Sequence, residues 1–356
     1  MPKVNRKKKG VGFALVILLL VLTVVVFAKL SPLLGIFSNK EIELKKDDDK
    51  INVLLLGIAG GIHDGPNLTD TIIFASIDPV QNKVVLVSIP RDLWIEDIKA
   101  RINVAYAKGG ISMAKGAVYK VVGQPIDYVV RVDFEGFEKA IDLLGGVEVD
   151  VLDAFDDYEY PIVGKENDPC GHMDEELDAL ATASSQLEAF PCRYTHLYFD
   201  KGLQHMDGAT ALKFVRSRHG KGEEGTDFGR SKRQAELIKA VKDKVFSVST
   251  LLNPAKIFSL YNVVKNSIDT NIKEEEFDDF VKLANKMSGS TIHNIVLDYG
   301  DKEKNRPGFL VHPGTLDIYR NEWVLIPRIG NDDFSEIKKY VECEIKVGNC
   351  PITAKP

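Results

Sequence analysis

Arginines recur at short spacings in this sequence, and their side chains are suited to bind phosphate. Arg91 stands beside Asp92 where an apolar run ends, and Arg216 and Arg218 flank a single serine. If the second segment is extended, its two arginines share one face, where their charges repel unless an anion lies between them. The planar guanidinium group binds phosphate through paired hydrogen bonds. A surface ion pair at Arg91 and a solvated basic strand at residues 216–218 remain the alternatives.

A third arginine-rich segment opens a predicted helix. Arg230, Arg233 and Gln234 have the i, i+3, i+4 spacing of one helix face, and this face continues into the apolar Leu237 and Val241. These side chains are therefore expected to point toward the protein body. Arginines in a first turn oppose the helix dipole, whereas a helix N-terminus that also presents arginines is suited to hold a phosphate. Together the three segments predict a polyanionic ligand such as a pyrophosphate.

An aspartate completes the candidate site. Asp70 stands at the start of a predicted strand. A carboxylate near several arginines is either an ion-pair partner or a magnesium ligand, because magnesium favours carboxylate oxygens together with substrate phosphate oxygens. A metal ion and arginines would together neutralise a departing phosphate. The residue types alone leave both roles open.

Strands and helices of mixed order must position these residues. Strands are predicted over residues 51–58, 71–77, 83–89, 127–132, 147–151, 293–297 and 323–326. Helices are predicted over residues 103–122, 135–144, 207–215 with Asp207 as N-cap, 228–246, 254–266 and 273–287. The continuous apolar run 51–58 is typical of a strand buried on both faces. The pattern predicts an α/β fold, an α-β-α sandwich with a central mixed sheet.

Residues 153–192 are expected to form an acidic surface insertion. The stretch 153–189 holds 11 acidic residues and one lysine. We interpret it as a solvated loop, with calcium binding as the alternative. Of the three ways to pair four cysteines, Cys170–Cys192 and Cys343–Cys350 are the simplest, and the first pair would tie the insertion at its base. Four free thiols are the alternative.

The N-terminus predicts a membrane anchor. A basic tail over residues 1–10 precedes an uncharged apolar run, and residues 11–30 are long enough to span a bilayer as a helix. Basic flanks stay in the cytoplasm, so a linker over residues 31–50 and a domain over residues 51–340 would face outward from a single-pass cell-membrane protein. Residues 341–356 would form a C-terminal tail. A cleavable signal peptide is the competing interpretation.

The motifs, in their order, resemble the LytR-CpsA-Psr family of cell-wall glycopolymer ligases. The resemblance covers roughly residues 51–245, with weaker features to about residue 337. The matching segments are residues 52–57, 69–71, 88–92, 101–103 with 105–106, 145–147, 202 with 204 and 207–208, 216–218 and 227–234. Each motif is weak alone, but eight in the family order make a specific match.

This resemblance implies an activity and a set of roles. Family members transfer glycopolymers such as teichoic acids from a polyprenyl-pyrophosphate carrier to peptidoglycan, with magnesium. Carried onto this chain, the pyrophosphate would be held by Arg91, Arg216, Arg218, Arg230 and Arg233, with Arg101 and Gln234 at further positions of the site. Asp70 would bind magnesium, and Asp92 would be the base for the acceptor hydroxyl.

One position departs from the family pattern. Many members carry an aspartate just after the first strand, as a second acidic group at the metal, and Ala59 stands at that place here. Asp64 is expected to substitute for it from the following loop, with His63 as a possible further donor. The alternative is a site with one acidic ligand fewer and weaker metal binding.

Two other functions compete with glycopolymer transfer. One is a non-catalytic protein that binds polyprenyl pyrophosphate or holds wall enzymes together, and the other is a pyrophosphatase. The net charge of −6 gives no support for nucleic-acid binding. The sequence holds no G-x-S-x-G elbow of a serine hydrolase.

Overall fold

The structure is a computed structural model that describes residues 42–61, 65–181, 183, 185–245, 267–287, 289–301 and 306–352. The predicted membrane helix, the helix predicted over residues 254–266, and the loop residues His63 and Asp64 lie outside these ranges. Within the described ranges, no helix is both long enough and apolar enough to cross a bilayer.

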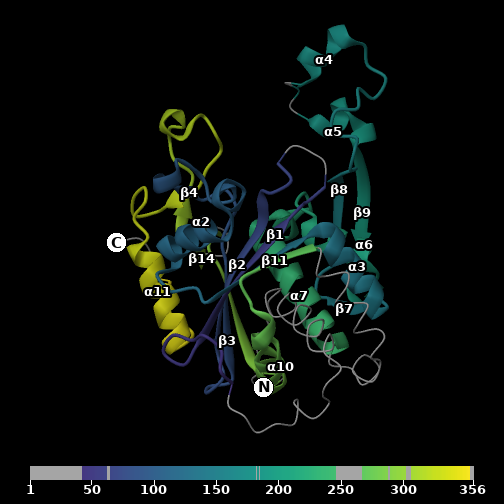
Figure 1. Cartoon of the computed structure of the whole chain (residues 1–356). Coiled ribbons are helices and arrows are strands. Elements are labelled where there is room, and N and C mark those ends of the chain that lie inside the picture. The colour runs from purple at the N-terminus through teal and green to yellow at the C-terminus, as the bar shows by residue number, and fades with distance from the viewer. Residues whose placement is uncertain are drawn as a thin grey trace, which may run out of the picture.

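A mixed six-stranded sheet forms the centre of the fold (Figure 1). Its strands, in spatial order, are β11 (Ile268–Thr270), β6 (Tyr128–Asp133), β1 (Ile51–Ile58), β2 (Thr69–Asp78), β3 (Lys83–Ser88) and β12 (Thr291–Val296). β1 runs parallel to β6, and β3 runs parallel to β12, whereas β2 is antiparallel to both of its neighbours. The carboxyl ends of β1, β3, β6 and β12 therefore meet the amino end of β2 at one edge, called here the carboxyl edge.

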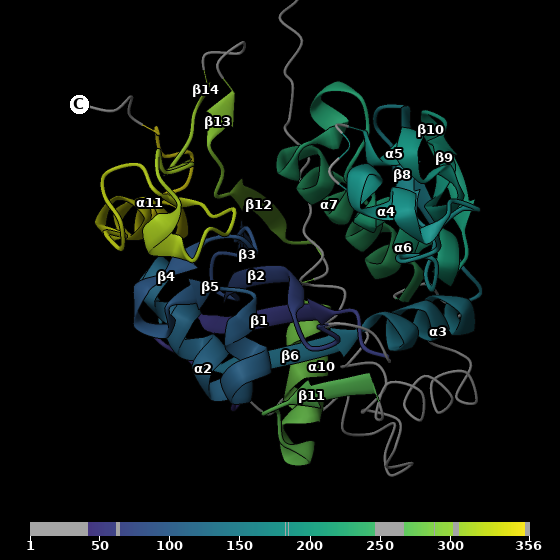
Figure 2. The ribbon, with the colours of Figure 1, turned by 90° about the horizontal axis from the view of Figure 1, so that it is seen from above.

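Helices cover both faces of this sheet (Figure 2). Along β1, Leu54 and Leu56 face a core shared with α2 (Val104–Val122) and α11 (Ser335–Lys346). Val53 and Leu55 face the opposite core, which is shared with α3 (Phe134–Leu144), α6 (Gly208–Arg216), α7 (Asp227–Val245) and α10 (Phe277–Lys286). Successive strand residues point to opposite faces, so a strand buried on both faces needs an unbroken apolar run. The predicted α-β-α sandwich is confirmed.

Two of the helices that cover this second face begin at aspartates. The Asp207 carboxylate accepts a hydrogen bond from the Thr210 N–H at 2.8 Å, as predicted for the start of α6. Asp133, the last residue of β6, accepts one from the Gly136 N–H at 2.8 Å and so starts α3. Such caps satisfy N–H groups that have no partner within the helix.

The acidic insertion is more ordered than its composition predicts. β8 (Phe155–Pro161) and β9 (Tyr194–Phe199) form an antiparallel hairpin, capped by α4 (Asp174–Ala181), α5 (Gln186–Ala189) and a 3-10 turn (Pro191–Arg193). The hairpin base belongs to the core, where the Phe155 ring packs 5.1 Å from that of Phe199. The predicted Cys170–Cys192 disulfide is present, but it ties the cap at the tip of the hairpin and not the base of the insertion. Beside the hairpin, β7 (Val147–Val151) pairs with β10 (Gly202–Met206).

Short elements complete the carboxyl edge and the C-terminal part. β4 (Trp94–Ile95) and β5 (Ala100–Arg101) flank a 3-10 turn (Glu96–Ile98), and further 3-10 turns cover Gly222–Gly225, Glu274–Glu276 and Asp317–Tyr319. β13 (Gly300–Asp301) pairs with β14 (Arg306–Pro307), and β15 (Leu310–Val311) pairs with β16 (Ile326–Pro327). α11 runs across the predicted domain boundary at residue 340, because Val341 and Ile345 are buried against the sheet. The predicted Cys343–Cys350 disulfide is present.

Candidate functional site

A pocket opens at the carboxyl edge and gathers residues that are distant in the sequence. It encloses about 320 Å³, its open mouth included. Its polar lining comes from the start of β2, the end of β3 and the first turns of α7, and its apolar lining comes from the same strands and the end of β12. The lining residues are Asp70, Thr71, Ile72, Ile73, Ser88, Ile89, Pro90, Arg230, Ser231, Gln234, Val296 and Leu297. Three of the predicted site residues, Asp70, Arg230 and Gln234, therefore meet here.

Arg91 joins this group through Asp70. The Arg91 Nη1 donates to Asp70 Oδ1 at 2.6 Å, and the two side chains are 28% and 34% exposed. The loop that carries Arg91 is fixed on both sides, because Ile89 N–H bonds the Ile72 carbonyl and Leu93 N–H bonds that of Pro90. A charge-assisted bond of this length holds the guanidinium against Asp70, although Arg91 is itself not among the residues that line the pocket.

Asp92 and Arg101 continue the charged network away from the pocket. Arg101 Nη1 donates to Asp92 Oδ1 at 2.9 Å, and its Nε lies 2.9 Å from Glu322 Oε2. Asp92 Oδ2 lies 3.7 Å from the Arg91 Nε, so this buried carboxylate stands between two arginines. Neither Asp92 nor Arg101 lines the pocket, and the contacts of Asp92 are those of a residue that holds Arg91 and Arg101 in place.

On α7, the three residues that were predicted to share one face point to two different places. Arg230 and Gln234 line the pocket, where Gln234 Nε2 lies 3.5 Å from the Thr71 hydroxyl. Arg233 is 1% exposed and bonds the last turn of α6 and the loop after it instead. It donates to the carbonyls of Phe214, Ser217 and Glu224 at 2.9, 2.6 and 2.8 Å, and to the Glu224 carboxylate at 2.7 Å.

These contacts make Arg233 a cross-link between α7 and the loop after α6. Its guanidinium carbon also lies 4.4 Å above the centre of the Phe155 ring. Burial lowers the pKa of the Arg233 guanidinium, and Glu224 opposes that shift. Helical spacing predicted that Arg233 faces the protein body, and this prediction is confirmed. The spacing did not predict that the Arg233 N–H groups bond backbone carbonyls of a neighbouring segment.

Arg216 and Arg218 do not share a strand face. Arg216 is the last residue of α6, and the backbone becomes extended only at Ser217, so the extended interpretation of residues 214–218 is wrong. The Arg216 guanidinium carbon lies 4.3 Å from the centre of the Phe134 ring, at the start of α3. Neither arginine is among the residues that line the pocket.

The loop that carries Arg218 is held by a carboxylate that the sequence did not single out. Asp157, on β8, is fully buried and accepts from Ser217 Oγ at 2.5 Å. It also accepts from the backbone N–H groups of Arg218 and His219, at 3.2 and 3.3 Å. Asp157 is one of 11 acidic residues in residues 153–189, so the composition of this stretch did not distinguish it from its neighbours. Its position on a strand facing the core was the only signal, and the strand itself was not predicted.

A magnesium ion would find one described carboxylate in the pocket, that of Asp70. Asp133 lies at the same edge, but it caps α3 and contacts Arg131. Ala59 contributes no ligand, and Asp64 lies outside the described residues. Because magnesium is commonly held by one or two carboxylates together with substrate phosphates, Asp70 fits a metal shared with a bound diphosphate.

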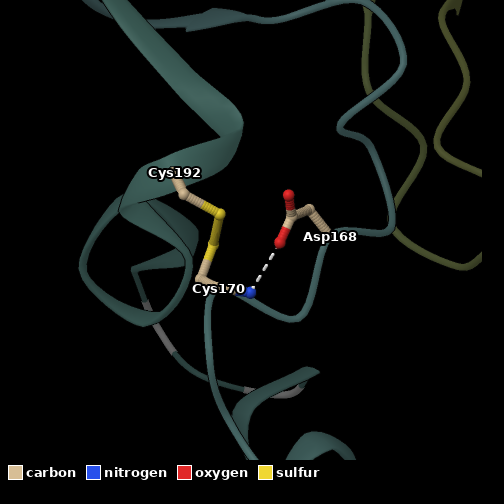
Figure 3. A group of neighbouring side chains, drawn as sticks. All are labelled: Asp168, Cys170 and Cys192. Carbon is tan, nitrogen blue, oxygen red and sulfur yellow. Dashed lines mark hydrogen bonds between the residues drawn. A yellow bond between two sulfur atoms is a disulfide. The ribbon is translucent and has the colours of Figure 1, made fainter.

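Elsewhere in the described residues, one group of side chains has the spacing of a metal site but cannot act as one. Asp168, Cys170 and Cys192 offer ligand atoms within 4.8 Å of one another (Figure 3). Both sulfurs are consumed by the disulfide, and the Asp168 carboxylate accepts from the Cys170 N–H at 2.9 Å. That bond supports the left-handed backbone of Cys170, whose φ is 54°.

Comparisons with known proteins agree with this architecture. The chain is 30% identical over 245 residues to the polyisoprenyl-teichoic acid–peptidoglycan teichoic acid transferase TagV of Bacillus subtilis, a match that covers 67% of this chain and 53% of TagV. It is 28% identical over 260 residues to TagU of the same organism, covering 72% and 69% of the two chains. The crystal structure of Bacillus subtilis TagV superposes with a TM-score of 0.55 at 25% identity, covering 84% of this chain and 98% of that one.

The chain thus spans about half the length of TagV in the sequence match. The model of the LytR_cpsA_psr family matches residues 35–310, which include the sheet, the pocket and the insertion. This chain belongs to the LytR_cpsA_psr family.

Proposed function

We propose that this protein transfers a glycopolymer from a polyprenyl-pyrophosphate carrier to peptidoglycan. The observation that carries the proposal is the meeting of Asp70, Arg230 and Gln234 around one pocket, with Arg91 hydrogen-bonded to Asp70 at 2.6 Å. The names of TagV and TagU, which are teichoic acid transferases, support the same class of reaction. A pocket that joins Arg230 to apolar strand residues, with Arg91 bonded to Asp70 in its wall, suits a diphosphate that carries a lipid.

The proposed reaction breaks the phosphoanhydride bond. An acceptor hydroxyl of peptidoglycan attacks the phosphorus that bears the glycan, a new P–O bond forms, and polyprenyl phosphate leaves. Arg91 and Arg230 would stabilise the charge on the departing phosphate, because hydrogen-bond donors aimed at developing charge lower the barrier to its formation. The hydroxyl proton passes to a base. The family resemblance alone proposes Asp92 for this role, since its contacts with Arg91 and Arg101 are those of a positioning residue. Arg216 and Arg218 would contact parts of the carrier outside the pocket, and Arg101 would position Asp92.

Magnesium remains part of the proposal. Asp70 would hold the ion together with oxygens of the diphosphate, and Asp64 would be a second ligand from the loop after β1. A bound magnesium ion would supply positive charge that neutralises the phosphates. Arg91, which bonds the Asp70 carboxylate, would then exchange part of that contact for the substrate phosphate.

The proposed location is the outer face of the cell membrane. Residues 11–30 would anchor the chain, with the basic tail in the cytoplasm and the folded domain outside. The two disulfides of the folded domain support an oxidising compartment.

A turnover assay with a labelled lipid-linked saccharide, peptidoglycan and magnesium tests the proposal. The expected result is label attached covalently to peptidoglycan, with release of polyprenyl phosphate. Tight binding of the lipid without any product would support a scaffold protein instead. Release of a free glycan phosphate without attachment would support a pyrophosphatase. Either of these outcomes contradicts glycopolymer transfer.

A further inference from the structure

Trp323 is an exposed aromatic side chain beside the charged network of the site. The chain has two tryptophans, of which Trp94 is 1% exposed and Trp323 is 59% exposed. A large aromatic ring left in water has a free-energy cost that burial in the core would remove. The position of Trp323 therefore suggests a ligand, provided that the ring is held rigidly and lies near the site.

The ring of Trp323 is held on one side by His312. The two rings stack with centroids 3.8 Å apart and an interplanar angle of 17°. The His312 Nδ1 lies 3.0 Å from the Val324 carbonyl, to which it donates as the Nδ1–H tautomer. One face of the indole is thus covered, and the exposed area must belong to the other face and the ring edge.

The segment that carries Trp323 is fastened to the loop that carries Asp92. Leu325 N–H donates to the Asp92 carbonyl at 2.9 Å, and Trp94 N–H donates to the Leu325 carbonyl at 2.9 Å. Glu322, the residue before Trp323, pairs with Arg101 at 2.9 Å. The series Glu322, Arg101, Asp92, Arg91 and Asp70 runs from the residue before Trp323 to the pocket through contacts of 2.6–3.7 Å. In Figure 1 the loop between β15 and β16 lies at the end of the molecule where β1 ends.

The surroundings of Trp323 select the kind of ligand. The side chains of Arg320 and Asn321, which are near Trp323 in the sequence, are exposed, and that of Glu322 is 34% exposed. In the same loop Ile318 is the other strongly exposed apolar side chain, at 68%. A lipid tail or an apolar protein surface requires a contiguous apolar patch. One flat apolar ring in a segment that also carries a guanidinium, an amide and a carboxylate matches a pyranose, which presents a face of C–H bonds and a rim of hydroxyls. Carboxylate, guanidinium and amide groups can all bond such hydroxyls.

We infer that Trp323, stacked on His312, is a platform on which a sugar ring of the acceptor peptidoglycan strand rests. The inference depends on the proposed function, because it places the acceptor glycan beside the diphosphate pocket. The acceptor fits better than the donor glycan, since the platform is an open rim that a large polymer can approach, whereas the first donor sugar is tethered to the diphosphate. Trp323 is then a positioning residue that brings the acceptor hydroxyl toward Asp92 and Arg91.

The test measures two ligands on the same set of full-length variants. Soluble glycan strands of alternating N-acetylglucosamine and N-acetylmuramic acid report on the platform, and inorganic pyrophosphate reports on the pocket. Calorimetric titration is expected to show about tenfold weaker strand binding for Trp323→Ala, which is the size of one aromatic stacking contact. Pyrophosphate affinity is expected to stay unchanged in this variant. Arg91→Ala should show the opposite pattern.

Tyr198→Ala is the matched control, because Tyr198 is 55% exposed and lies on β9 of the insertion. The inference would be overturned if Trp323→Ala and Tyr198→Ala lost the same amount of affinity for the glycan strands. It would also be overturned if Trp323→Ala bound the glycan strands as tightly as the wild type, or if the wild type did not bind them. Strand binding that depends on Trp323, in a protein with no affinity for pyrophosphate, would instead count against the proposed function alone. The emission of the buried Trp94 reports whether the Trp323→Ala variant is folded.

Discussion

Arg91 is hydrogen-bonded to Asp70, which lines the pocket, so a diphosphate bound there has to compete with Asp70 for the same guanidinium. The bond between them is 2.6 Å long, and both side chains remain about one-third exposed. An exposed ion pair of this kind contributes little to folding stability. The ion pair instead restricts the conformations of the Arg91 side chain, which reduces the entropy that this side chain loses when a ligand binds.

Arg91→Ala is expected to lower the rate of transfer by about 100-fold or more, the usual effect of removing one donor that stabilises developing charge. Its melting temperature should stay close to that of the wild type, because the side chain is partly exposed. Arg218→Ala should also lose activity. Lys139→Ala, which removes an exposed cation from α3, serves as the control in the same turnover assay. Normal turnover in both arginine variants would exclude the arginine cluster.

Asp70→Asn keeps the shape of the side chain and removes its charge. If Asp70 binds magnesium, the concentration of magnesium that gives half-maximal activity should rise by roughly tenfold or more. A magnesium titration of activity measures this, and Arg91→Ala is the control for loss of the ion pair alone. A magnesium response identical to that of the wild type would leave Asp70 as a structural partner of Arg91.

Arg233→Ala is expected to act on folding. The Arg233 side chain is 2% exposed and pairs with Glu224, and removing one partner of a buried pair typically costs about 3–5 kcal/mol. Urea unfolding measures the free energy of unfolding, and Arg91→Ala is the comparison at an exposed arginine. A variant that loses activity while keeping wild-type stability would return Arg233 to the role of a phosphate ligand.

At the scale of elements, α7 connects the pocket to the core. Its first turns place Arg230 and Gln234 in the pocket, and Arg233 fastens the loop after α6. Further along the helix, Leu237, Ile238 and Val241 are buried against the sheet. The rigidity of the pocket wall therefore depends on the packing of this one helix.

Glu236 gives α7 a pH-dependent stability. Burial raises the pKa of its carboxyl group from 4.5 to about 8, with Lys232 opposing the shift and Glu224 adding to it. The folded state thus binds this proton more tightly than the unfolded state, so stability should fall as pH rises from about 4.5 to about 8. Glu236→Gln, which stays neutral, should match the wild type near pH 5 and melt at a higher temperature near pH 9. Equal melting temperatures at both values would contradict the raised pKa.

The sequence predicted those helices and strands that are determined by the pattern of their own residues. β7 has the predicted bounds, because Val147, Val149 and Val151 alternate with acidic residues. The hairpin β8–β9 was missed because its register shifts between Asp157 and Tyr160, which breaks the alternation. The predicted helix over residues 103–122 contains a kink at Gly109 and Gly110 that its apolar pattern does not indicate.

The site could be predicted only in part, because some of its contacts join segments that are distant in the sequence. Asp70 and Arg91 follow from strand ends, since the ends of neighbouring strands meet at one edge of a sheet. The roles of Glu322, Asp157 and the carbonyl partners of Arg233 depend on contacts between segments up to 221 positions apart. Such contacts leave no periodicity in a single sequence.

At the scale of the whole molecule, the sheet topology brings the site together. β2 enters the carboxyl edge where β1, β3, β6 and β12 leave it, and this arrangement places Asp70 beside the loop of Arg91. α7 lies over that edge from one layer, and the segment of Glu322 and Trp323 approaches it beside Asp92. A pocket assembled from so many segments exists only in the folded chain.

A crystal structure of the outer domain with a diphosphate-headed polyprenyl lipid would be the most direct measurement. Density for the diphosphate is expected in the pocket, within hydrogen-bonding distance of Arg91 and Arg230 and next to Asp70. The lipid chain should extend between the sheet and its helices. Density for the diphosphate on a separate surface, away from these three residues, would contradict the pocket as the binding site.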